Sequence, residues 1–299
     1  MNHDPGPPTL QPQAGKIYPK VEYKPRKTAN TLYITDNLSN FGLRHLMEET
    51  LVTDVALVTG GSGGIGKAVC ERLARDGYRV VATDLSEAAA VALAARLPGE
   101  GHVGYALDVT DDSGIASLLT KVEEQHGPIR TLVAAAGILL LGDDGQRRPI
   151  TQISNEEWQK TQEVNSSGTF FLLRAFLRLR GVQRVEGARF IAFSSVAAQL
   201  GGYRSSAAYI ASKSAVLGLV KAGAREGADL GVLVNAVAPG LIDAPMLRLS
   251  LDPSADHEVN TTIPQGRIGT PEDVAGAVSS LASLDSAYTT GSVIDVNGG

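Results

Sequence analysis

The feature that most restricts how this chain folds is a regular alternation of short apolar runs with longer amphipathic stretches, beginning at Asp54. Each run is rich in valine or alanine and has the length of a strand, whereas the stretches between the first six have helical periodicity. This order is typical of a parallel sheet covered on both faces, so we predict one α/β domain with a doubly wound, seven-stranded sheet. The predicted strands are Val55–Thr59, Arg79–Thr83, Val103–Leu107, Thr131–Ala135, Ala188–Phe193, Val232–Val237 and Ser292–Val296.

Composition excludes several classes of protein. The net charge of −5 leaves no basic surface for nucleic acid. The longest apolar stretch, residues 132–141, is shorter than the ~20 residues that cross a bilayer, so we expect no membrane contact and a cytoplasmic protein. Cys70 is the single cysteine, and the five histidines lack metal-ligand spacing, so we expect neither a disulfide framework nor a metal site.

Residues 1–50 differ from the remainder, residues 51–299, which form the predicted catalytic domain. The N-terminal stretch is rich in proline and has no apolar core of the kind found in secretory leaders, so we interpret it as a loosely structured extension. A short helix is expected near Phe41–Thr50, where Leu43 and Met47 have helical spacing. Two interpretations stay open: a solvated tail, or an arm that clasps a neighbouring subunit.

A glycine-rich loop directly follows the first predicted strand and leads into a predicted helix. A loop in this position presents backbone N–H groups at a helix N-terminus, where they and the helix dipole bind a pyrophosphate. Glycine is needed because a side chain would hold the phosphates away from the backbone. The predicted contacts are Gly60, Ser62, Gly63, Gly64, Ile65 and Gly66.

Two acidic residues follow the next two strands. Asp84, with Leu85 after it, stands where a carboxylate accepts hydrogen bonds from an adenosine ribose and repels a 2′-phosphate. No basic residue follows it, so the sequence predicts NAD as cofactor. Asp108 and Val109 are placed to contact the adenine. The alternative for each aspartate is the capping of the helix that follows it.

Tyr209 and Lys213 form the strongest chemical signal, because residues at i and i+4 share one face of a helix. A nearby ammonium is expected to lower the pKa of the tyrosine toward working pH, which suits a general acid and base. Upstream, Ser194 and Ser195 end a strand at the sheet edge where α/β proteins bind ligands. Strand alternation favours Ser195 over Ser194 as the reacting hydroxyl.

These residues, in this order and spacing, resemble the short-chain dehydrogenase/reductase family in its short form, which has a Rossmann-like fold. The resemblance implies that Tyr209 is the general acid/base, that Ser195 orients the carbonyl and that Lys213 binds the nicotinamide ribose. It further implies that Asn165 holds a water in a proton relay. Cofactor contacts implied by the resemblance are Ala135, Ala136, Gly137, Pro239, Gly240 and Ile242. Ala134–Gly137 lacks the asparagines that the family often has there.

The favoured interpretation is an NAD-dependent alcohol dehydrogenase or ketoreductase that transfers a hydride between NAD(H) and a secondary alcohol or ketone, acting as a homodimer or homotetramer. One alternative is a 3-oxoacyl-thioester (acyl carrier protein) reductase using NADPH, because residues 263–269 resemble that branch. A second, of another class, is a non-catalytic cofactor-sensing regulatory protein. We expect residues 142–150 and 243–268 to shape the substrate site.

Overall fold

The computed structural model describes residues 54–202 and 204–299, so the extension and the short helix expected within it lie outside the described residues. Within those ranges the predicted fold class is confirmed: seven parallel strands form one sheet in the order β3-β2-β1-β4-β5-β6-β7. Every strand lies within two residues of its predicted bounds. The strands are β1 (Val55–Thr59), β2 (Arg79–Asp84), β3 (Val103–Ala106), β4 (Ile129–Ala134), β5 (Ala188–Phe193), β6 (Val232–Pro239) and β7 (Val293–Val296).

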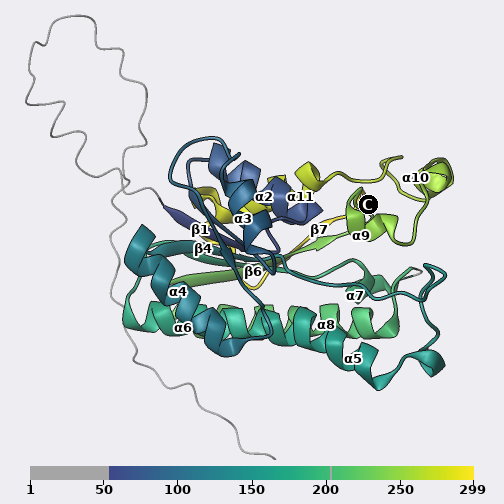
Figure 1. Cartoon of the computed structure of the whole chain (residues 1–299), viewed down its shortest axis with the longest axis horizontal. Coiled ribbons are helices and arrows are strands. Elements are labelled where there is room, and N and C mark those ends of the chain that lie inside the picture. The colour runs from purple at the N-terminus through teal and green to yellow at the C-terminus, as the bar shows by residue number, and fades with distance from the viewer. Residues whose placement is uncertain (1–53, 203) are drawn as a thin grey trace, which may run out of the picture. The chain divides into compact units, whose positions relative to one another are not determined.

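Helices cover both faces of the sheet (Figure 1). One face carries α2 (Gly64–Arg75), α3 (Glu87–Ala94) and α11 (Pro271–Ala282). The other carries α4 (Asp112–His126), α5 (Asn155–Gln162), α6 (Gly168–Val182) and α8 (Ala207–Ala228). A π-helical turn, η2 (Glu163–Ser167), joins α5 to α6. Short elements complete the described chain: α7 (Ala197–Leu200), α9 (Pro245–Arg248), α10 (Asp256–Thr261) and the 3₁₀ turns Ile150–Gln152, Pro253–Ala255 and Leu284–Ser286.

The two faces bury separate apolar cores, and the alternation of side chains along β1 explains why. Val55 and Leu57 pack into the core beneath α4, α6 and α8, whereas Ala56 and Val58 pack against α2 and α11. All four are essentially inaccessible to solvent, as expected for a central strand of a parallel sheet.

The chain crosses from one side of the sheet to the other after β3, because β1 pairs with both β2 and β4. The connections that follow β1 and β4 therefore diverge to opposite faces and leave a crevice at the carboxyl edge. In open α/β sheets this switch point is where ligands bind. The crevice is thus set by strand order before any side chain is considered.

Deletion of residues 1–45 should leave a folded protein, because β1 begins at Val55 and has both strand partners within the described domain. We expect a cooperative thermal transition, followed by circular dichroism, with a midpoint within a few degrees of the full chain. Loss of cooperativity would place part of the extension in the core. A cooperative transition with a changed mass in light scattering would favour the subunit-clasping alternative.

Candidate active site

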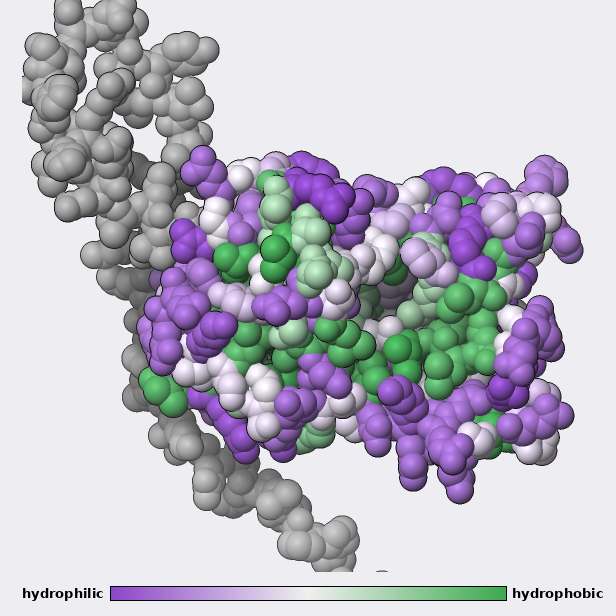
Figure 2. All heavy atoms as spheres, in the orientation of Figure 1, coloured by the Kyte–Doolittle hydropathy of each residue, from purple (hydrophilic) through white to green (hydrophobic). Residues whose placement is uncertain are grey.

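A cavity of about 1040 Å³ opens at the carboxyl edge of the sheet, and it contains most of the predicted site residues. In Figure 2 it is the hollow toward the side of α9 and α10, surrounded by apolar surface. A volume near ~1000 Å³ suits a dinucleotide together with a small substrate. The predicted residues that line it are Gly60, Gly63, Gly64, Ile65, Gly66, Asp84, Leu85, Asp108, Val109, Ala135, Ala136, Gly137, Ser195, Tyr209, Lys213, Pro239, Gly240 and Ile242.

The glycine loop turns tightly against the end of β4. Gly60 has φ of +63°, and a Cβ on it would stand 2.9 Å from the Cα of Ala136. A Cβ on Gly66 would stand 2.0 Å from the carbonyl oxygen of Gly60, so only glycine fits there. Gly63 caps α2 without a side-chain hydrogen bond, and the first turn of α2 holds no acidic residue. The helix start thus keeps unpaired N–H groups for an anion, which fits a pyrophosphate.

Asp84 lies at the end of β2, and its Oδ2 accepts hydrogen bonds from the backbone N of Ser62 at 3.2 Å and from the Ser62 hydroxyl at 2.5 Å. Ser62 therefore holds the carboxylate against the glycine loop without lining the cavity itself. The capping alternative is wrong for Asp84, because Ser86 caps α3 and accepts from Ala89 N. The residues present thus fit an adenosine ribose at Asp84.

Asp108 makes a local turn rather than a helix cap. Its Oδ1 accepts from the backbone N of Thr110 at 2.9 Å and from the Thr110 hydroxyl at 2.7 Å. The cap of α4 is Asp111, which accepts from Gly114 N at 3.0 Å. Asp108 and Val109 both line the cavity, in keeping with the predicted adenine contact.

The reacting side of the cavity brings together Ser195, just past β5, with Tyr209 and Lys213 of α8. Lys213 is buried, and its Nζ donates to the carbonyl oxygen of Phe193 at 2.9 Å and lies 5.9 Å from the Tyr209 ring centroid. The hydroxyl of Ser194 donates to the carbonyl oxygen of Lys213 at 3.0 Å, so that serine is occupied in holding α8 against β5. Ser195 is the serine whose hydroxyl forms a hydrogen bond with the Tyr209 side chain, and this bond acts to lower the pKa of Tyr209.

Asn165 lies in the π-helical turn and is fully buried, outside the cavity lining. Its Oδ1 accepts from Ile138 N at 2.8 Å, and its Nδ2 donates to Ile138 O at 2.9 Å and to the Ser212 hydroxyl at 3.0 Å. Ser212 in turn donates to the carbonyl oxygen of Tyr209 at 2.8 Å. The amide thus ties the segment after β4 to the helix that carries Tyr209. Ser212 is a positioning residue that the sequence did not single out.

Burial dominates the titration of the reacting groups. It raises the pKa of Tyr209, and the opposing hydrogen bond with Ser195 is the smaller effect. The expectation that Lys213 lowers the pKa of Tyr209 is therefore wrong for the protein without a bound cofactor. The same desolvation lowers the pKa of Lys213 to about 8, because a buried ammonium loses its hydration.

The substrate end of the cavity is formed partly by residues that sequence reasoning missed. Of the two segments expected there, residues 243–268 contribute α9 and α10, but residues 142–150 do not line the cavity. Within residues 142–150, the Arg148 side chain instead forms an ion pair with Glu157 at 3.1 Å. In place of residues 142–150, the last residue of α7, Leu200, and the loop residues Arg204 and Ser205 line the cavity.

Residues 54–202 and 204–299 lack two further kinds of feature. No group of three or more histidine, cysteine, aspartate or glutamate side chains in these ranges is arranged to hold a metal ion. No helix in the same ranges has the length and apolar character that crossing a membrane requires. The single cysteine, Cys70, is buried, and desolvation raises the pKa of its thiol to about 12.

The chain is similar in sequence to known reductases. Residues 60–299 match the profile of the family described as Enoyl-(Acyl carrier protein) reductase. The 3-oxoacyl-(acyl-carrier-protein) reductase FabG of Vibrio cholerae is 38% identical over 245 residues, which cover 82% of this chain and 96% of the relative. The reductase MabA of Mycobacterium tuberculosis is also 38% identical, over 83% of this chain and 93% of its own length.

The chain therefore belongs to the short-chain dehydrogenase/reductase family and is an oxidoreductase of that class. Within the family, the curated relatives just described are named as 3-oxoacyl-(acyl-carrier-protein) reductases. A crystal structure of a protein titled ribose-5-phosphate isomerase from Brucella melitensis 16M superposes with a TM-score of 0.74 at 28% identity, covering 83% of this chain and 93% of that one. Its name differs from those of the reductases, which illustrates that fold alone does not assign the reaction.

The buried Lys213 predicts a pH dependence of stability. Its pKa falls from 10.5 to about 8 on folding, so between pH 8 and 10 the unfolded chain holds a proton that the folded chain has released. The free energy of unfolding should therefore rise across this window, by on the order of 2 kcal/mol from this group. The free energy of unfolding of wild type and of Lys213→Met is measured by urea titration at several pH values in this window. The difference between the two slopes of free energy against pH isolates the contribution of Lys213. Equal slopes would contradict it.

Proposed function

We propose that this protein is an NAD(H)-dependent ketoreductase that interconverts a 3-oxoacyl and a 3-hydroxyacyl group. The observation that carries the proposal is that Ser195, Tyr209 and Lys213 line one cavity together with the start of α2, which has no side-chain cap. The names of the relatives support the acyl substrate over a general secondary alcohol. The proposal therefore combines the substrate class of the 3-oxoacyl-thioester reductase alternative with the cofactor, NAD(H), of the alcohol dehydrogenase interpretation.

The cofactor would be held by this chain's own groups along the length of the cavity. The N–H groups at the start of α2 would take the pyrophosphate, Asp84 the adenosine ribose and Lys213 the nicotinamide ribose. Pro239 at the end of β6, with Gly240 and Ile242 just after it, lines the cavity where the nicotinamide would lie. When bound, NADH supplies the hydride for reduction, and NAD accepts it for oxidation.

Proton transfer falls to Tyr209. In reduction its phenol gives a proton to the carbonyl oxygen, and in oxidation its phenolate takes the proton from the hydroxyl. Burial raises the pKa of Tyr209, so the phenol is the form present at neutral pH, and it is the form that donates the proton in reduction. The Ser195 hydroxyl would donate a hydrogen bond to the same substrate oxygen and fix its orientation.

Asn165 acts on this chemistry through position. Its side-chain amide is already engaged by Ile138 and Ser212, and its backbone carbonyl oxygen accepts from the Thr169 hydroxyl at 2.8 Å. Its support of the proton relay is thus proposed to come from fixing α8, and with it Tyr209, relative to the end of β4. Both Nδ2 hydrogens are used in these bonds, so a water at the side chain would have only the second lone pair of Oδ1 to bind.

Assembly and location form part of the same proposal. The helices α5 and α6 carry large apolar side chains that are partly exposed, with Trp158 at 44% and Phe170 at 40%. Surface of this kind is suited to packing between subunits, which supports a homodimer or homotetramer. The cytoplasmic location is retained as a proposal that rests on composition.

Replacement of Tyr209 by phenylalanine should lower kcat at least ~100-fold, because it removes the proton donor and keeps the ring. The dissociation constant of NADH, measured by fluorescence titration, should change less than ~3-fold. The pair of measurements separates chemistry from binding. A kcat near that of wild type would refute the acid/base role and revive the cofactor-sensing alternative.

Cofactor choice is predicted from Asp84. NADP brings a phosphate against this carboxylate, and among the described residues no basic side chain lines the cavity at that end, so we expect kcat/KM to favour NAD at least ~10-fold. Asp84→Ala should weaken the preference. Asp285→Ala, which removes an exposed carboxylate outside the cavity, should leave it unchanged. Equal or better use of NADP by wild type would contradict the assignment of NAD.

A further inference from the structure

The substrate end of the cavity contains a guanidinium that the proposed reaction does not use. Arg204 lies in the loop between α7 and α8, is half-buried and lines the cavity together with Ser195 and Tyr209. Its Nη1 donates to the carbonyl oxygen of Ser250 at 2.8 Å. Among the residues that the structure describes, no carboxylate lies within ion-pair distance of it.

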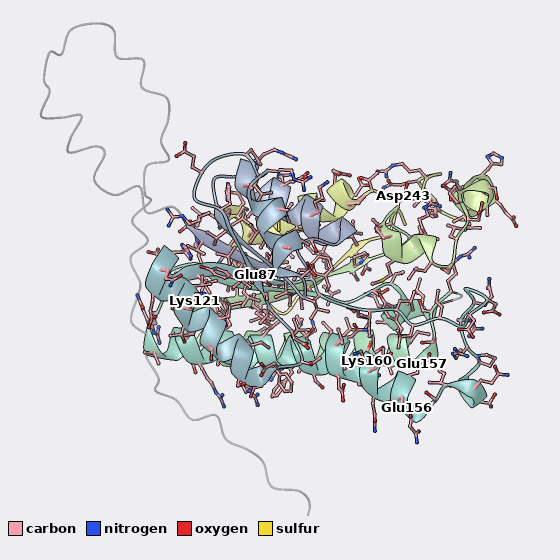
Figure 3. The ribbon with its side chains drawn as sticks, viewed as in Figure 1. Glu87, Lys121, Glu156, Glu157, Lys160 and Asp243 are labelled. Carbon is pink, nitrogen blue, oxygen red and sulfur yellow. The ribbon has the colours of Figure 1, made fainter. Side chains whose placement is uncertain are left out.

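The other charged groups at this end differ from Arg204 in exposure. Lys160, Glu163 and Glu258 also line the cavity, but all three are exposed to solvent. Figure 3 shows Lys160 on α5, in the lower part of the view, and Asp243 in its upper part. Lys213 is buried and engaged with Phe193. Arg204 is therefore the cation that combines partial burial with N–H groups left over for a ligand.

Part of the cavity wall at this end is apolar. Leu200, Met246, Leu247 and Val259 line the same end of the cavity and come from α7, α9 and α10. A guanidinium beside such a wall is partly desolvated, which is unfavourable unless an oxygen acceptor comes to meet it. Arginine carries several N–H donors in a planar fork, and it matches carboxylate and carbonyl oxygens well.

Arg204 lies close in the sequence to the start of α8, the helix that carries Tyr209. Ser206 caps α8, and its hydroxyl accepts from the backbone N of Tyr209 at 3.4 Å. Arg204 lies two positions before this cap. The hydrogen bond to Ser250 fixes its guanidinium against the segment after α9. The guanidinium is thus held at a set place relative to Tyr209 rather than on a free loop.

We propose that Arg204 binds an oxygen of the substrate beyond the reacting carbonyl, and so selects acyl substrates over plain ketones. The inference rests on the proposed function, in which the 3-oxo oxygen meets Ser195 and Tyr209. The oxygen that Arg204 receives is then the acyl oxygen, while the alkyl chain lies on the apolar wall. That oxygen belongs either to a neutral thioester or to a free carboxylate, two sources of one acceptor chemistry.

The test compares three substrates of equal chain length with NADH: an N-acetylcysteamine 3-oxoacyl thioester, the matching 3-oxoalkanoate and the matching 2-alkanone. Arg204→Gln removes the charge and keeps a donor for Ser250. It should lower kcat/KM at least ~10-fold for the acyl substrates, mainly through KM, and change the 2-alkanone less than ~2-fold. Arg204→Lys should recover part of the loss. A loss confined to the oxoalkanoate identifies the carboxylate as the ligand, and a loss confined to the thioester identifies the neutral carbonyl.

A matched control is Lys121→Gln, which removes an exposed cation from α4, at the far end of the view in Figure 3 from Lys160. It should leave all three rates unchanged. Equal losses on all three substrates in Arg204→Gln would show that Arg204 only straps the loop to Ser250, and unchanged rates would show that it binds no substrate; either overturns the inference. Reduction of the 2-alkanone alone by wild type would instead refute the 3-oxoacyl assignment.

Discussion

Every functional group of this protein depends on the parallel direction of its strands. Because all seven strands run the same way, the segments that follow β1, β2, β4, β5 and β6 emerge at one edge of the sheet. The glycine loop, Asp84, Gly137, Ser195 and Pro239 are thereby neighbours although they are far apart in the sequence. An antiparallel arrangement would send alternate segments to opposite edges, and no single cavity would form.

The buried amide of Asn165 adds the precision that the sheet alone does not provide. It joins three parts of the chain: the segment after β4, the π-helical turn and α8. Such π-helical turns within longer helices often occur at functional sites, and here the turn places the amide in reach of Ser212. A fully satisfied buried network of this kind fixes its members, because any shift leaves a polar atom unpaired.

The cavity has different electrostatic character at its two ends. The end that faces the glycine loop has Asp84 and Asp108, whose carboxylates are fixed by Ser62 and Thr110. The substrate end has an apolar wall and the half-buried Arg204. Between them lies Lys213, whose charge is destabilised by burial. In the proposed function this gradient would orient a ligand pair, with the hydroxyl-rich ribose toward the carboxylates and an oxygen acceptor on an apolar body toward the arginine.

The sequence by itself determined what depends on local pattern. The strand bounds follow from apolar runs, the anion site from glycine after β1, and the pairing of Tyr209 with Lys213 from helical spacing, so all were predictable. Only the tertiary structure decided the rest. Ser212 meets Asn165, and Arg204 enters the cavity, through contacts between segments distant in the chain or through the path of a loop. The direction of the Tyr209 pKa shift likewise could not be predicted, because desolvation depends on everything packed around a side chain, whereas spacing reports only its neighbours along one helix.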